Sequence, residues 1–545
     1  MLQPQTPGPV PRDTARVARA AFPKGSPLVT LRDELGTVFS DDDFAALYPS
    51  LGQPAYPPWR LALVTVLQFR ENLTDRQAAD AVRARLDWKY ALSLELDDPG
   101  FDFSVLSEFR ARLLDGGAED RLLGRMLELF QGRGLLAGGG RQRTDATHVV
   151  GAVRELNRLE IVGETLHAAL NVLAQVAPAW LSDRVDAGWF ERYGERFSDY
   201  RLPKPYAERV ELVGCDGMGL LDAVYGPEAP DYLRAVPTVD VLRRVWVQHF
   251  YVDGDRLRWR EQKSFPPSAL MVASPYDLDV RYSQKRGTEW KGFKVHLTET
   301  CEPDRPNLIT HVATTAATDQ DVTALEGIHD GLGARGLLPA EHLADGAYLS
   351  AAELVKSRDR YGVEMVGPMR VDASWQAADP DALEAAQFAI DWEAEQVTCP
   401  MGERSYKWSP SRGRGGKPSF HVQFPKRACA ACEARPRCTR SETAPRSLGL
   451  HPRAEHEAMV AAREHQKTAA FKERYKARSG VEGTISEAAF ALGMRRARYR
   501  GREKTHLQHV ATAAAMNLKR ALAWLDGVPR SGTRVSHFAR LAVAA

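Results

Sequence analysis

The stretch GFKVHLTETCEPDRPNLITHVATTAA, residues 292–317, contains two β-branched segments joined by a short polar loop. Such a pair is typical of neighbouring strands in one sheet. Further along the chain, helical periods at 321–332 and 351–361 alternate with the short apolar stretches HLADGAY (342–348) and VEMVGPM (363–369). This alternation predicts a mixed α/β sheet. The stretch RTDATHVVGAV (143–153) adds one more strand from an earlier part of the chain.

Helical periodicity and changes of composition divide the rest of the chain around this sheet. Residues 139–153 and 277–369 form the predicted core, and residues 451–526 are predicted as C-terminal helices that complete it. The other predicted segments are a flexible Pro-rich arm (1–28), an all-α N-terminal domain (29–138), a mostly helical insertion (154–276), a basic Cys-rich insertion (370–450) and a tail (527–545).

Length and composition narrow the class of protein. The chain has 545 residues, of which 44% are hydrophobic and 26% are charged, as expected for a globular protein with more than one core. Its longest apolar stretches, at 61–67 and 488–494, are much shorter than the roughly 20 residues that a membrane span needs. The first residues contain no apolar segment typical of a secretory signal. The sequence therefore predicts a cytoplasmic protein with no membrane partner.

The net charge of +2 hides two strongly basic segments. Residues 404–440 contain ten Lys or Arg and one Glu, and residues 463–504 contain twelve Lys or Arg and five Glu. Such clusters are the electrostatic pattern of a nucleic-acid binder, because Lys and Arg neutralise phosphates and release counterions. Two solvated faces would carry the same pattern, so charge alone leaves both interpretations open.

The N-terminal helices predict a DNA-binding unit. Thr74 and Gln77 have the spacing of a capping box, which marks a helix start after a tight turn. Two short helices joined by such a turn resemble a helix-turn-helix unit, whose second helix enters the major groove of DNA. Arg83, Arg85 and Lys89 lie in the predicted second helix and are the candidate DNA-binding residues of this domain. A plain helical bundle is the alternative.

Three acidic residues are candidates for a metal site. Asp345 follows an apolar strand and precedes a glycine, a position that brings a carboxylate to the edge of a sheet. Asp145 lies in the strand at 143–153, and Glu482 lies among the C-terminal helices. Carboxylates gathered at one edge need a cation, and Mg²⁺ prefers oxygen ligands. The rival acids are Asp279, Asp319 and Asp321.

Together with their neighbours, these residues resemble the DDE transposases of bacterial insertion sequences. Tyr475, Arg478 and Glu482 reproduce the family signature of Tyr, two residues, Arg, three residues, Glu. Asp345 stands in a family-like Asp-Gly-Ala-Tyr element, and Asp145 stands in an early Asp-x-Thr strand. The resemblance covers most of residues 31–525, including a helical N-terminal part at 31–114 and the segment 274–300, and it is weakest at 154–276.

The resemblance implies an RNase H-like core in which Asp145, Asp345 and Glu482 hold two Mg²⁺ or Mn²⁺ ions. Such ions activate water, and then a DNA 3′-hydroxyl, for attack on a phosphodiester. Tyr475 and Arg478 are implied to lie near this site, where Arg478 reaches a DNA phosphate. The implied partners are double-stranded DNA, namely the terminal repeats of the element and the target, and a second copy of the chain in a homodimer that pairs the two ends.

The sequence departs from the family signature at one position. The signature continues with a Lys seven residues after the Glu, where this chain has Ala489. Arg495 and Arg496 follow shortly afterwards and are the candidates to take over the phosphate contact. His148, three residues after Asp145, is more simply a structural histidine than a site residue.

The helix around Glu482 is expected to be unusual. Gly480 and Gly483 flank this residue, and each disfavours a helix by about 1 kcal/mol relative to Ala. Thr484 and Glu487 have the spacing of a capping box. These features predict either an irregular helix or one that starts near Thr484.

Four of the six cysteines gather late in the chain. Cys429 and Cys432 have the Cys-x₂-Cys spacing of a zinc-binding turn, Cys399 starts a Cys-Pro-Met-Gly loop, and Cys438 follows shortly after the pair. This pattern predicts a structural Zn²⁺ ion in a small zinc-ribbon-like insertion. Four reduced thiols without a metal are the alternative.

Two functions from different classes fit these features. The first is a DDE transposase that binds the ends of its element and catalyses metal-dependent DNA cleavage and strand transfer. The second is a catalytically inactive, domesticated, sequence-specific DNA-binding protein, in which Ala489 marks lost activity. A stand-alone metal-dependent nuclease would not need the helical N-terminal domain or the long insertion. Because all three acids are present, the sequence favours the transposase.

Overall fold

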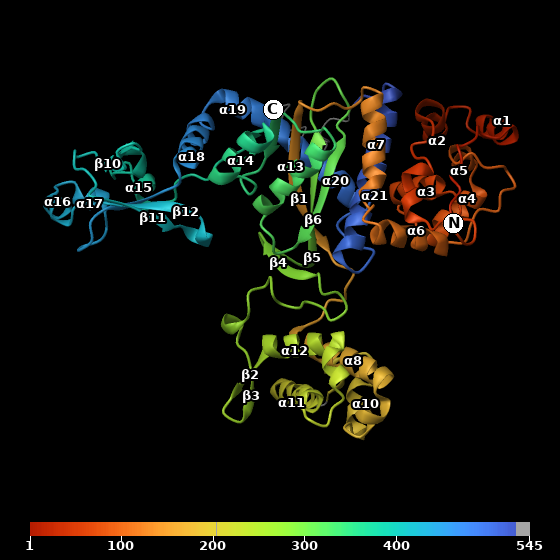
Figure 1. The fold of residues 1–545 in the computed structure, drawn as a ribbon, viewed down its shortest axis with the longest axis horizontal. Helices are drawn as coiled ribbons and strands as arrows, with labels where there is room; N and C mark the ends of the chain where they lie inside the picture. Colours follow the sequence, from red (N-terminus) through yellow and green to blue (C-terminus); the bar gives the residue numbers. More distant parts are fainter. Residues whose placement is uncertain (203, 530–545) are drawn as a thin grey trace, which may run out of the picture.

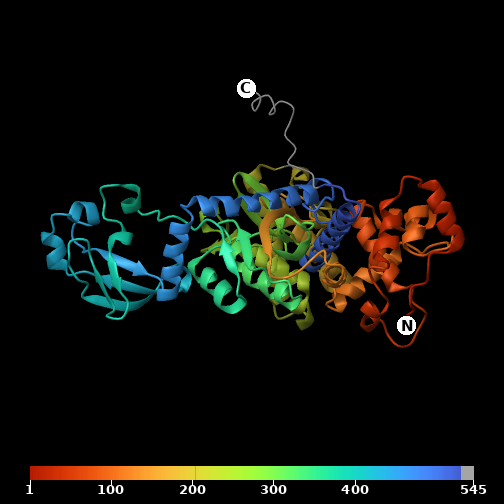
Figure 2. The same ribbon diagram turned by 90° about the horizontal axis from the view of Figure 1, so that it is seen from above.

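The computed structural model describes residues 1–202 and 204–529. A central α/β core carries three extensions: the N-terminal helices on one side, the Cys-rich insertion on the opposite side, and the helical insertion below (Figure 1). Seen from above, the Cys-rich insertion, the core and the N-terminal helices form an elongated row (Figure 2). The tail predicted at 527–545 lies outside the described residues, apart from residues 527–529.

The core is built on one six-stranded sheet. Its strands are β1 (Arg141–Val150), β4 (Arg281–Lys285), β5 (Thr288–Thr300), β6 (Ile309–Ala316), β7 (Glu341–Ala344) and β8 (Glu364–Val366). The order is β4-β5-β1-β7-β8, and β6 also pairs with β5. Strand β1 runs antiparallel to β5 and parallel to β7, and β7 runs parallel to β8. The mixed α/β sheet predicted from the sequence is therefore confirmed.

The strand β5 is buried on both faces. Phe293, Val295 and Leu297 on one face, and His296 and Thr298 on the other, are 1% exposed or less. A sheet buried in this way must be covered by other elements on both sides. Around it lie η6 (Asp321–Ala324), α13 (Leu325–Ala334), α14 (Ala351–Tyr361), α20 (Gly480–Phe490) and α21 (Arg502–Leu525). Helices α13 and α21 pack on β6, α20 packs on β1 and β5, and α14 packs on β8.

The N-terminal helices share a hydrophobic core with the sheet. The reason is α21, which packs on α3 (Pro58–Arg70) and α7 (Arg121–Gly132) as well as on β6. The other elements of this part are α1 (Arg12–Ala21), α2 (Pro27–Thr30), the π-helix η1 (Leu31–Leu35), the 3-10 helix η2 (Asp42–Leu47), α4 (Asp75–Ala84), α5 (Leu86–Ala91) and α6 (Ser104–Asp115).

Two predictions for the N-terminal part have different outcomes. The capping box is confirmed, because the Thr74 hydroxyl accepts the N–H of Gln77 and the Gln77 side chain accepts the N–H of Thr74 at 2.9 Å. The flexible arm at 1–28 is wrong for the segment that forms α1. Thr14 in this helix is fully buried, and its hydroxyl donates to the carbonyl of Leu94 at 2.8 Å, so α1 is anchored to the rest of the domain.

The helical insertion has a hydrophobic core of its own. Its elements are α8 (Arg158–Val176), α9 (Pro178–Ser182), α10 (Ala187–Tyr193), η3 (Asp199–Arg201), α11 (Tyr206–Tyr225), η4 (Asp231–Ala235), α12 (Pro237–His249), β2 (Phe250–Asp253), β3 (Arg256–Trp259) and η5 (Gln262–Ser264). Residues 151–157 lead from β1 into this unit, and residues 265–280 lead back to β4. The insertion therefore joins the core at one place (Figure 1).

The Cys-rich insertion is a small unit of short strands and helices. Its strands are β9 (Ala389–Asp391), β10 (Gln396–Thr398), β11 (Lys407–Arg412), β12 (Pro418–Gln423) and β13 (Ser447–Leu450). Its helices are α15 (Trp375–Ala378), η7 (Ala385–Gln387), η8 (Arg414–Gly416), α16 (Lys426–Ala431) and α17 (Arg435–Cys438). From it, α18 (Arg453–His465), α19 (Ala469–Lys476) and the 3-10 helix η9 (Ala477–Ser479) lead back to α20 at the sheet.

Candidate active site

Asp145 lies on β1, and Asp345 directly follows the neighbouring parallel strand β7. In the register of β1 and β7, Thr144 pairs with Ala344, and each aspartate is the next residue in the chain. Neighbouring strands lie about 4.8 Å apart. Backbone groups orient both carboxylates, because Asp145 accepts the N–H of Ala146 at 2.8 Å and Asp345 accepts the N–H of Ala347 at 2.9 Å. The sheet thus brings together two acids that are distant in sequence.

Arg478 connects Asp145 with Glu482. One terminal nitrogen of its guanidinium lies 2.6 Å from Asp145 Oδ2, and the other lies 2.7 Å from Glu482 Oε1. The side chains of Asp145 and Arg478 are 15% and 13% exposed, whereas that of Glu482 is 65% exposed. Glu482 is therefore the outermost of the three acids, and the arginine links it to the strand that carries Asp145.

The charged groups of this cluster act on one another. Burial raises the pKa of Asp145, and the charge of Asp345 adds to the rise, against the lowering effect of Arg478. Burial by itself would lower the pKa of Arg478, but the surrounding acidic groups, led by Asp145, outweigh it and raise this pKa. Negative charge is thus concentrated beside the middle of β1 and the end of β7, and Arg478 offsets it.

Tyr475 is held beside this cluster by α19. Its ring is stacked on Phe471, with the ring centroids 5.6 Å apart. Phe471 packs in turn against Leu343 of β7 and Val366 of β8. Burial raises the pKa of Tyr475 above its ordinary value. The phenol therefore keeps its proton and can donate a hydrogen bond toward a ligand of the site.

A buried ion-pair network fixes the helix that carries Glu482. Glu299 of β5 is fully buried and accepts hydrogen bonds from Arg143 at 2.8 Å, from Arg520 at 2.8 Å and from Thr484 at 2.6 Å. Arg143 also donates to the carbonyl of Ala477, the residue before Arg478. The network therefore ties η9 and α20 to β1 and β5.

Of the two alternatives predicted for the helix around Glu482, a start near Thr484 is wrong, whereas an irregular helix agrees with the 3-10 segment η9 that directly precedes α20. The helix begins at Gly480 rather than near Thr484, and its first turn contains Glu482. Thr484 does not cap the helix, because its hydroxyl donates to Glu299. A glycine at 480 is needed for a close approach, since a Cβ there would lie 2.1 Å from Arg143 Nη1. The tertiary contact thus outweighs the poor helix propensity of glycine.

The donors of the cluster fit a hard divalent cation. Asp145, Asp345 and Glu482 offer carboxylate oxygens, the ligands that Mg²⁺ and Mn²⁺ prefer. Among residues 1–202 and 204–529, no group of three or more His, Cys, Asp or Glu side chains is gathered as a complete metal centre. In this arrangement Glu482 is paired with Arg478. Arg478 Nε is buried and has no hydrogen-bond partner among the described residues, so this donor is unused in the arrangement of the site described here.

Arg495 and Arg496 lie along β1, beyond the acids. Arg495 Nε donates to Thr147 Oγ1 at 2.9 Å, and Thr147 points to the same face of β1 as Asp145 because side chains alternate along a strand. The backbone of Arg495 accepts the N–H of Val150 at 2.8 Å, and Arg496 is bridged to Val150. The structure therefore brings Arg495 close to the acids and places Arg496 at the end of the strand.

Lys285 of β4 is a site residue that the sequence did not single out. Its charge lowers the pKa of Asp145 and contributes to the lowered pKa of His148, whose main cause is burial. Lys285 lies in the family-like segment 274–300, but no spacing in the sequence distinguishes it from the other polar residues of this segment as a site residue. His148 contacts the ring of Trp290, with centroids 5.5 Å apart, and it has no carboxylate partner among the described residues.

The rival acids are used elsewhere in the fold. Asp279 accepts the N–H of Arg502 at the start of α21, at 3.0 Å. Asp319 caps the end of β6 by accepting the N–H of Ala316 at 3.0 Å. Asp321 is buried and pairs with Lys294 at 2.9 Å. Each of these carboxylates therefore has a local structural role.

The candidate DNA-binding residues of the N-terminal part differ in how far contacts within the fold already use their charges and donors. Lys89 is 2% exposed, and its ammonium group donates to two backbone carbonyls at 3.2 and 2.8 Å. The prediction that Lys89 contacts DNA is wrong for this conformation, because folding already uses its charge and its donors. Arg85 is held in two ion pairs and Arg83 in one. Contact of Arg83 and Arg85 with DNA stays a prediction.

The four late cysteines line a single cavity of about 340 Å³ in the Cys-rich insertion. Cys399 follows β10, Cys429 lies in α16, Cys432 ends it, and Cys438 ends α17. All four are free thiols. Burial raises the pKa of Cys438, and the other three cysteines add to the rise. The chain thus gathers the thiols, although the described residues do not form a complete metal centre there.

Comparison with known families finds two matches in separate parts of the chain. Residues 16–112 match the family Transposase domain (DUF772), and residues 398–522 match the family Transposase DDE domain. The second match contains the four late cysteines together with Tyr475, Arg478 and Glu482, and the first contains α3 to α5. These matches confirm the resemblance to DDE transposases of insertion sequences, and they support a transposase function.

A search of curated proteins finds no match to the chain. In the described part of the chain, no helix combines the length and the apolar character that crossing a bilayer requires.

Proposed function

We propose that the chain is the transposase of a bacterial insertion sequence, which binds the ends of its element and catalyses metal-dependent cleavage and strand transfer of DNA. One observation carries the proposal: Asp145 lies on β1, Asp345 directly follows the neighbouring parallel strand β7, and Arg478 connects Asp145 with Glu482. The matches to two transposase families, one at each end of the chain, support it independently.

An RNase H-like core is part of this proposal. Support comes from the order β6-β5-β1-β7-β8, in which β5 is the one strand that runs against the other four. Asp145 lies on the first strand of the core, and Asp345 follows the strand beside it. An edge where neighbouring strands deliver acidic residues is where a ligand binds in an α/β sheet.

We infer that Asp145, Asp345 and Glu482 hold two Mg²⁺ or Mn²⁺ ions. When bound, the ions supply charge stabilisation at the phosphodiester and activate the attacking hydroxyl. The chain itself supplies the rigid placement of the acids, because backbone N–H groups orient both aspartates and Glu299 fixes α20. Arg478 offsets the acidic charge, and its guanidinium is the group proposed to contact a DNA phosphate.

Double-stranded DNA, both the element ends and the target, is the proposed partner. The basic segments 404–440 and 463–504 supply positive charge. Arg495 and Arg496 are the proposed substitutes for the signature Lys that Ala489 replaces. A homodimer that pairs the element ends and a cytoplasmic location remain proposals that rest on the family resemblance.

A structural Zn²⁺ ion in the Cys-rich insertion is proposed from the cavity that Cys399, Cys429, Cys432 and Cys438 share. Thiolates are the ligands that structural zinc prefers. Metal analysis of the purified chain should give about one equivalent of zinc. Cys429→Ser should lower it, whereas Cys215→Ser, at an exposed cysteine outside the cavity, should not. Folded wild-type protein that contains no zinc would overturn this assignment.

The proposed activity is tested by Mg²⁺-dependent cleavage of a plasmid that carries the element ends. Asp145→Asn, Asp345→Asn and Glu482→Gln should each abolish cleavage while DNA binding is retained. The matched control is Asp279→Asn, since it removes an aspartate charge outside the cluster and the amide oxygen can still accept the N–H of Arg502. Cleavage that survives any of the three substitutions shows that this acid is wrongly assigned. Tight DNA binding by a wild type that never cleaves would favour the inactive, domesticated DNA-binding protein.

A further inference from the structure

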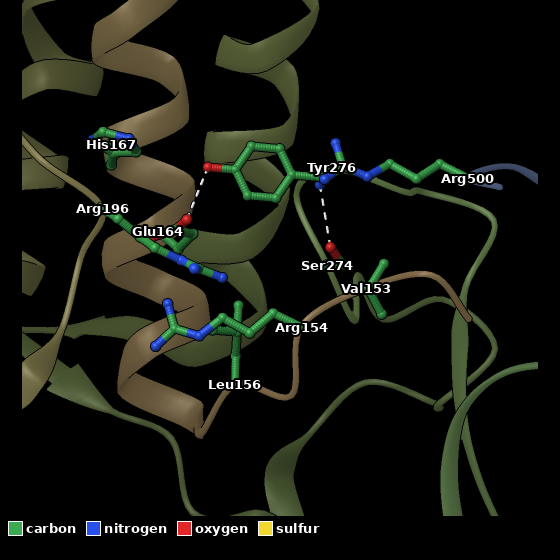
Figure 3. Close-up of a pocket in the computed structure, with 9 residues that line it drawn as sticks. All are labelled: Val153, Arg154, Leu156, Glu164, His167, Arg196, Ser274, Tyr276 and Arg500. Carbon is green, nitrogen blue, oxygen red and sulfur yellow. Dashed lines mark hydrogen bonds between the residues drawn. The ribbon is translucent and has the colours of Figure 1, made fainter. Parts of the chain in front are cut away.

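A cavity of about 400 Å³ lies where the helical insertion joins the core. Its walls come from the loop after β1, from α8, from the loop before η3, from the segment that leads back to β4, and from the loop before α21. Figure 3 shows Arg154 and Arg196 reaching into it from opposite sides of the view, and Arg500 extending from the right toward Tyr276. We call this cavity, defined by Arg154, Arg196 and Arg500, the joint pocket.

The walls of the joint pocket carry positive charge in excess. Arg154 pairs with Glu160 at 2.9 Å. Arg196 and Arg500 form no ion pair with any residue in 1–202 or 204–529, and Arg500 lies over the ring of Tyr276 at 5.2 Å. Guanidinium groups that face one another repel, and a bound anion relieves this repulsion. The pocket is therefore suited to an anionic ligand and not to a cation.

The single carboxylate of the walls does not cancel this preference. Glu164 is 3% exposed, and both of its oxygens already accept hydrogen bonds. Tyr276 donates its hydroxyl to Oε1 at 2.9 Å, and the N–H of Phe197 is donated to Oε2 at 2.9 Å. Glu164 thus holds the segment that leads back to β4 and the loop before η3 against α8. It does not neutralise the arginines, which can contact the ligand.

The segment 495–500, which carries Arg495, Arg496 and Arg500, connects the acid cluster with the joint pocket. Arg495 is bonded to Thr147, two residues from Asp145, and Ala497 donates its N–H to the carbonyl of Val150 at 2.8 Å. The segment that leads to Arg500 therefore runs beside the end of β1. From Asp145 to Val150 the strand rises about 16 Å, which corresponds to roughly five phosphates along one DNA strand. One duplex can reach the acids and the pocket together.

We propose that the joint pocket binds a phosphate of the DNA backbone. This inference rests on the proposed transposase function and names a DNA contact that lies outside the acid cluster. Arg154 and Arg500 come from segments next to the core, whereas Arg196 comes from the insertion. A phosphate shared among them ties the insertion to the core when DNA is bound, and guanidinium groups bind phosphate oxygens by paired, charge-assisted hydrogen bonds.

The test is the salt dependence of DNA binding by the full-length chain without divalent ions. Fluorescence anisotropy with a labelled duplex gives the slope of the logarithm of the binding constant against the logarithm of the salt concentration. Arg196→Gln and Arg500→Gln should each reduce this slope by no more than about 0.9, the value for one phosphate contact, because the remaining arginines still lie beside that phosphate. The double variant should lose about 0.9, because both arginines contact the same phosphate. The control is Arg256→Gln, at an exposed arginine of the β3 hairpin outside the pocket, which should leave the slope unchanged.

Four results would overturn the proposal. If the wild type binds and cleaves DNA and the double variant has the same slope as the wild type, the pocket is rejected while the transposase function stays intact. A double variant whose slope falls by about 1.8 would indicate two separate surface contacts. Inorganic phosphate could raise the melting temperature of the wild type but not that of Arg196→Gln. If the salt slopes of DNA binding are also unchanged in the variants, the pocket binds a free anion and not DNA. Failure of the wild type to bind DNA at all would reject the transposase function and the pocket together.

Discussion

Replacing Gly480 by alanine should destabilise the fold, although alanine is the better helix former. Gly480 opens α20, the helix that carries Glu482, and a Cβ at this position would lie 2.1 Å from Arg143 Nη1. The Arg143 guanidinium cannot simply rotate away, because it is bonded to the fully buried Glu299 at 2.8 and 2.7 Å. Room for the new methyl group therefore comes from breaking this pair or from moving α20.

The magnitude follows from two opposing terms. Alanine gains at most about 1 kcal/mol of helix propensity over glycine. Breaking a buried ion pair costs about 3–5 kcal/mol, because a charge is left without its partner. The side chains of Arg143 and Glu299 are 7% and 0% exposed, so solvent screening does not reduce this cost. The unfolding free energy of Gly480→Ala should therefore fall by about 2–4 kcal/mol.

The assay is urea denaturation followed by circular dichroism, together with plasmid cleavage. Gly483→Ala is the matched control, since Gly483 lies in the same helix and a Cβ there meets no atom within 4 Å. This control should gain up to about 1 kcal/mol and keep its cleavage activity. Gly480→Ala should also cleave less, because Arg143 holds the carbonyl of Ala477 next to Arg478. Equal stabilisation by both substitutions would refute the role of Arg143 in positioning α20.

Further expected outcomes concern the buried histidines and the arginines near the acids. Burial lowers the pKa of His249 to about 3, so below pH 6.5 the unfolded state binds a proton that the folded state does not. At pH 5 this residue alone should therefore lower the free energy of unfolding by about 2 kcal/mol relative to neutral pH. In thermal melting, the melting temperature of His249→Gln should fall less on acidification than that of the wild type. In anisotropy titrations, Arg495→Gln should lower the affinity for DNA and reduce the salt slope by about 1. The control Arg358→Gln, far from the acids, should change neither quantity. Arg478→Gln should slow cleavage more than it weakens DNA binding, as single-turnover rates and binding constants would report; equal losses in both would make Arg478 a DNA-binding residue only.

Much of the core could be predicted because its signals are local. The β-branched stretches that became β1, β5 and β6 contain their own strand preference. Asp345 was recognisable because an acid between an apolar strand and a glycine has a fixed place at a sheet edge. The Thr74 capping box likewise depends on residues three apart. Features of this kind can be recognised in the sequence because they depend only on residues close to one another in the chain.

The features that escaped prediction depend on contacts between distant segments. Lys89 has the exposed pattern of a helix-surface lysine in the sequence, yet two carbonyls of the following loop bury it. In the sequence, Gly480 suggests a broken helix. In the structure, Arg143 of β1 occupies the space that a side chain at position 480 would need. The pairing of Arg478 with Asp145 and the gathering of the joint pocket likewise join segments far apart in the chain. No local spacing encodes such contacts.

Binding of Mn²⁺, measured by electron paramagnetic resonance in the presence of DNA, tests most directly whether the three acids form one metal site. The wild type is expected to bind Mn²⁺ with a signal that Asp145→Asn, Asp345→Asn and Glu482→Gln each weaken or abolish, whereas Asp279→Asn leaves it unchanged. Mn²⁺ binding that is the same in all four variants and in the wild type would contradict the assignment of Asp145, Asp345 and Glu482 as the metal ligands.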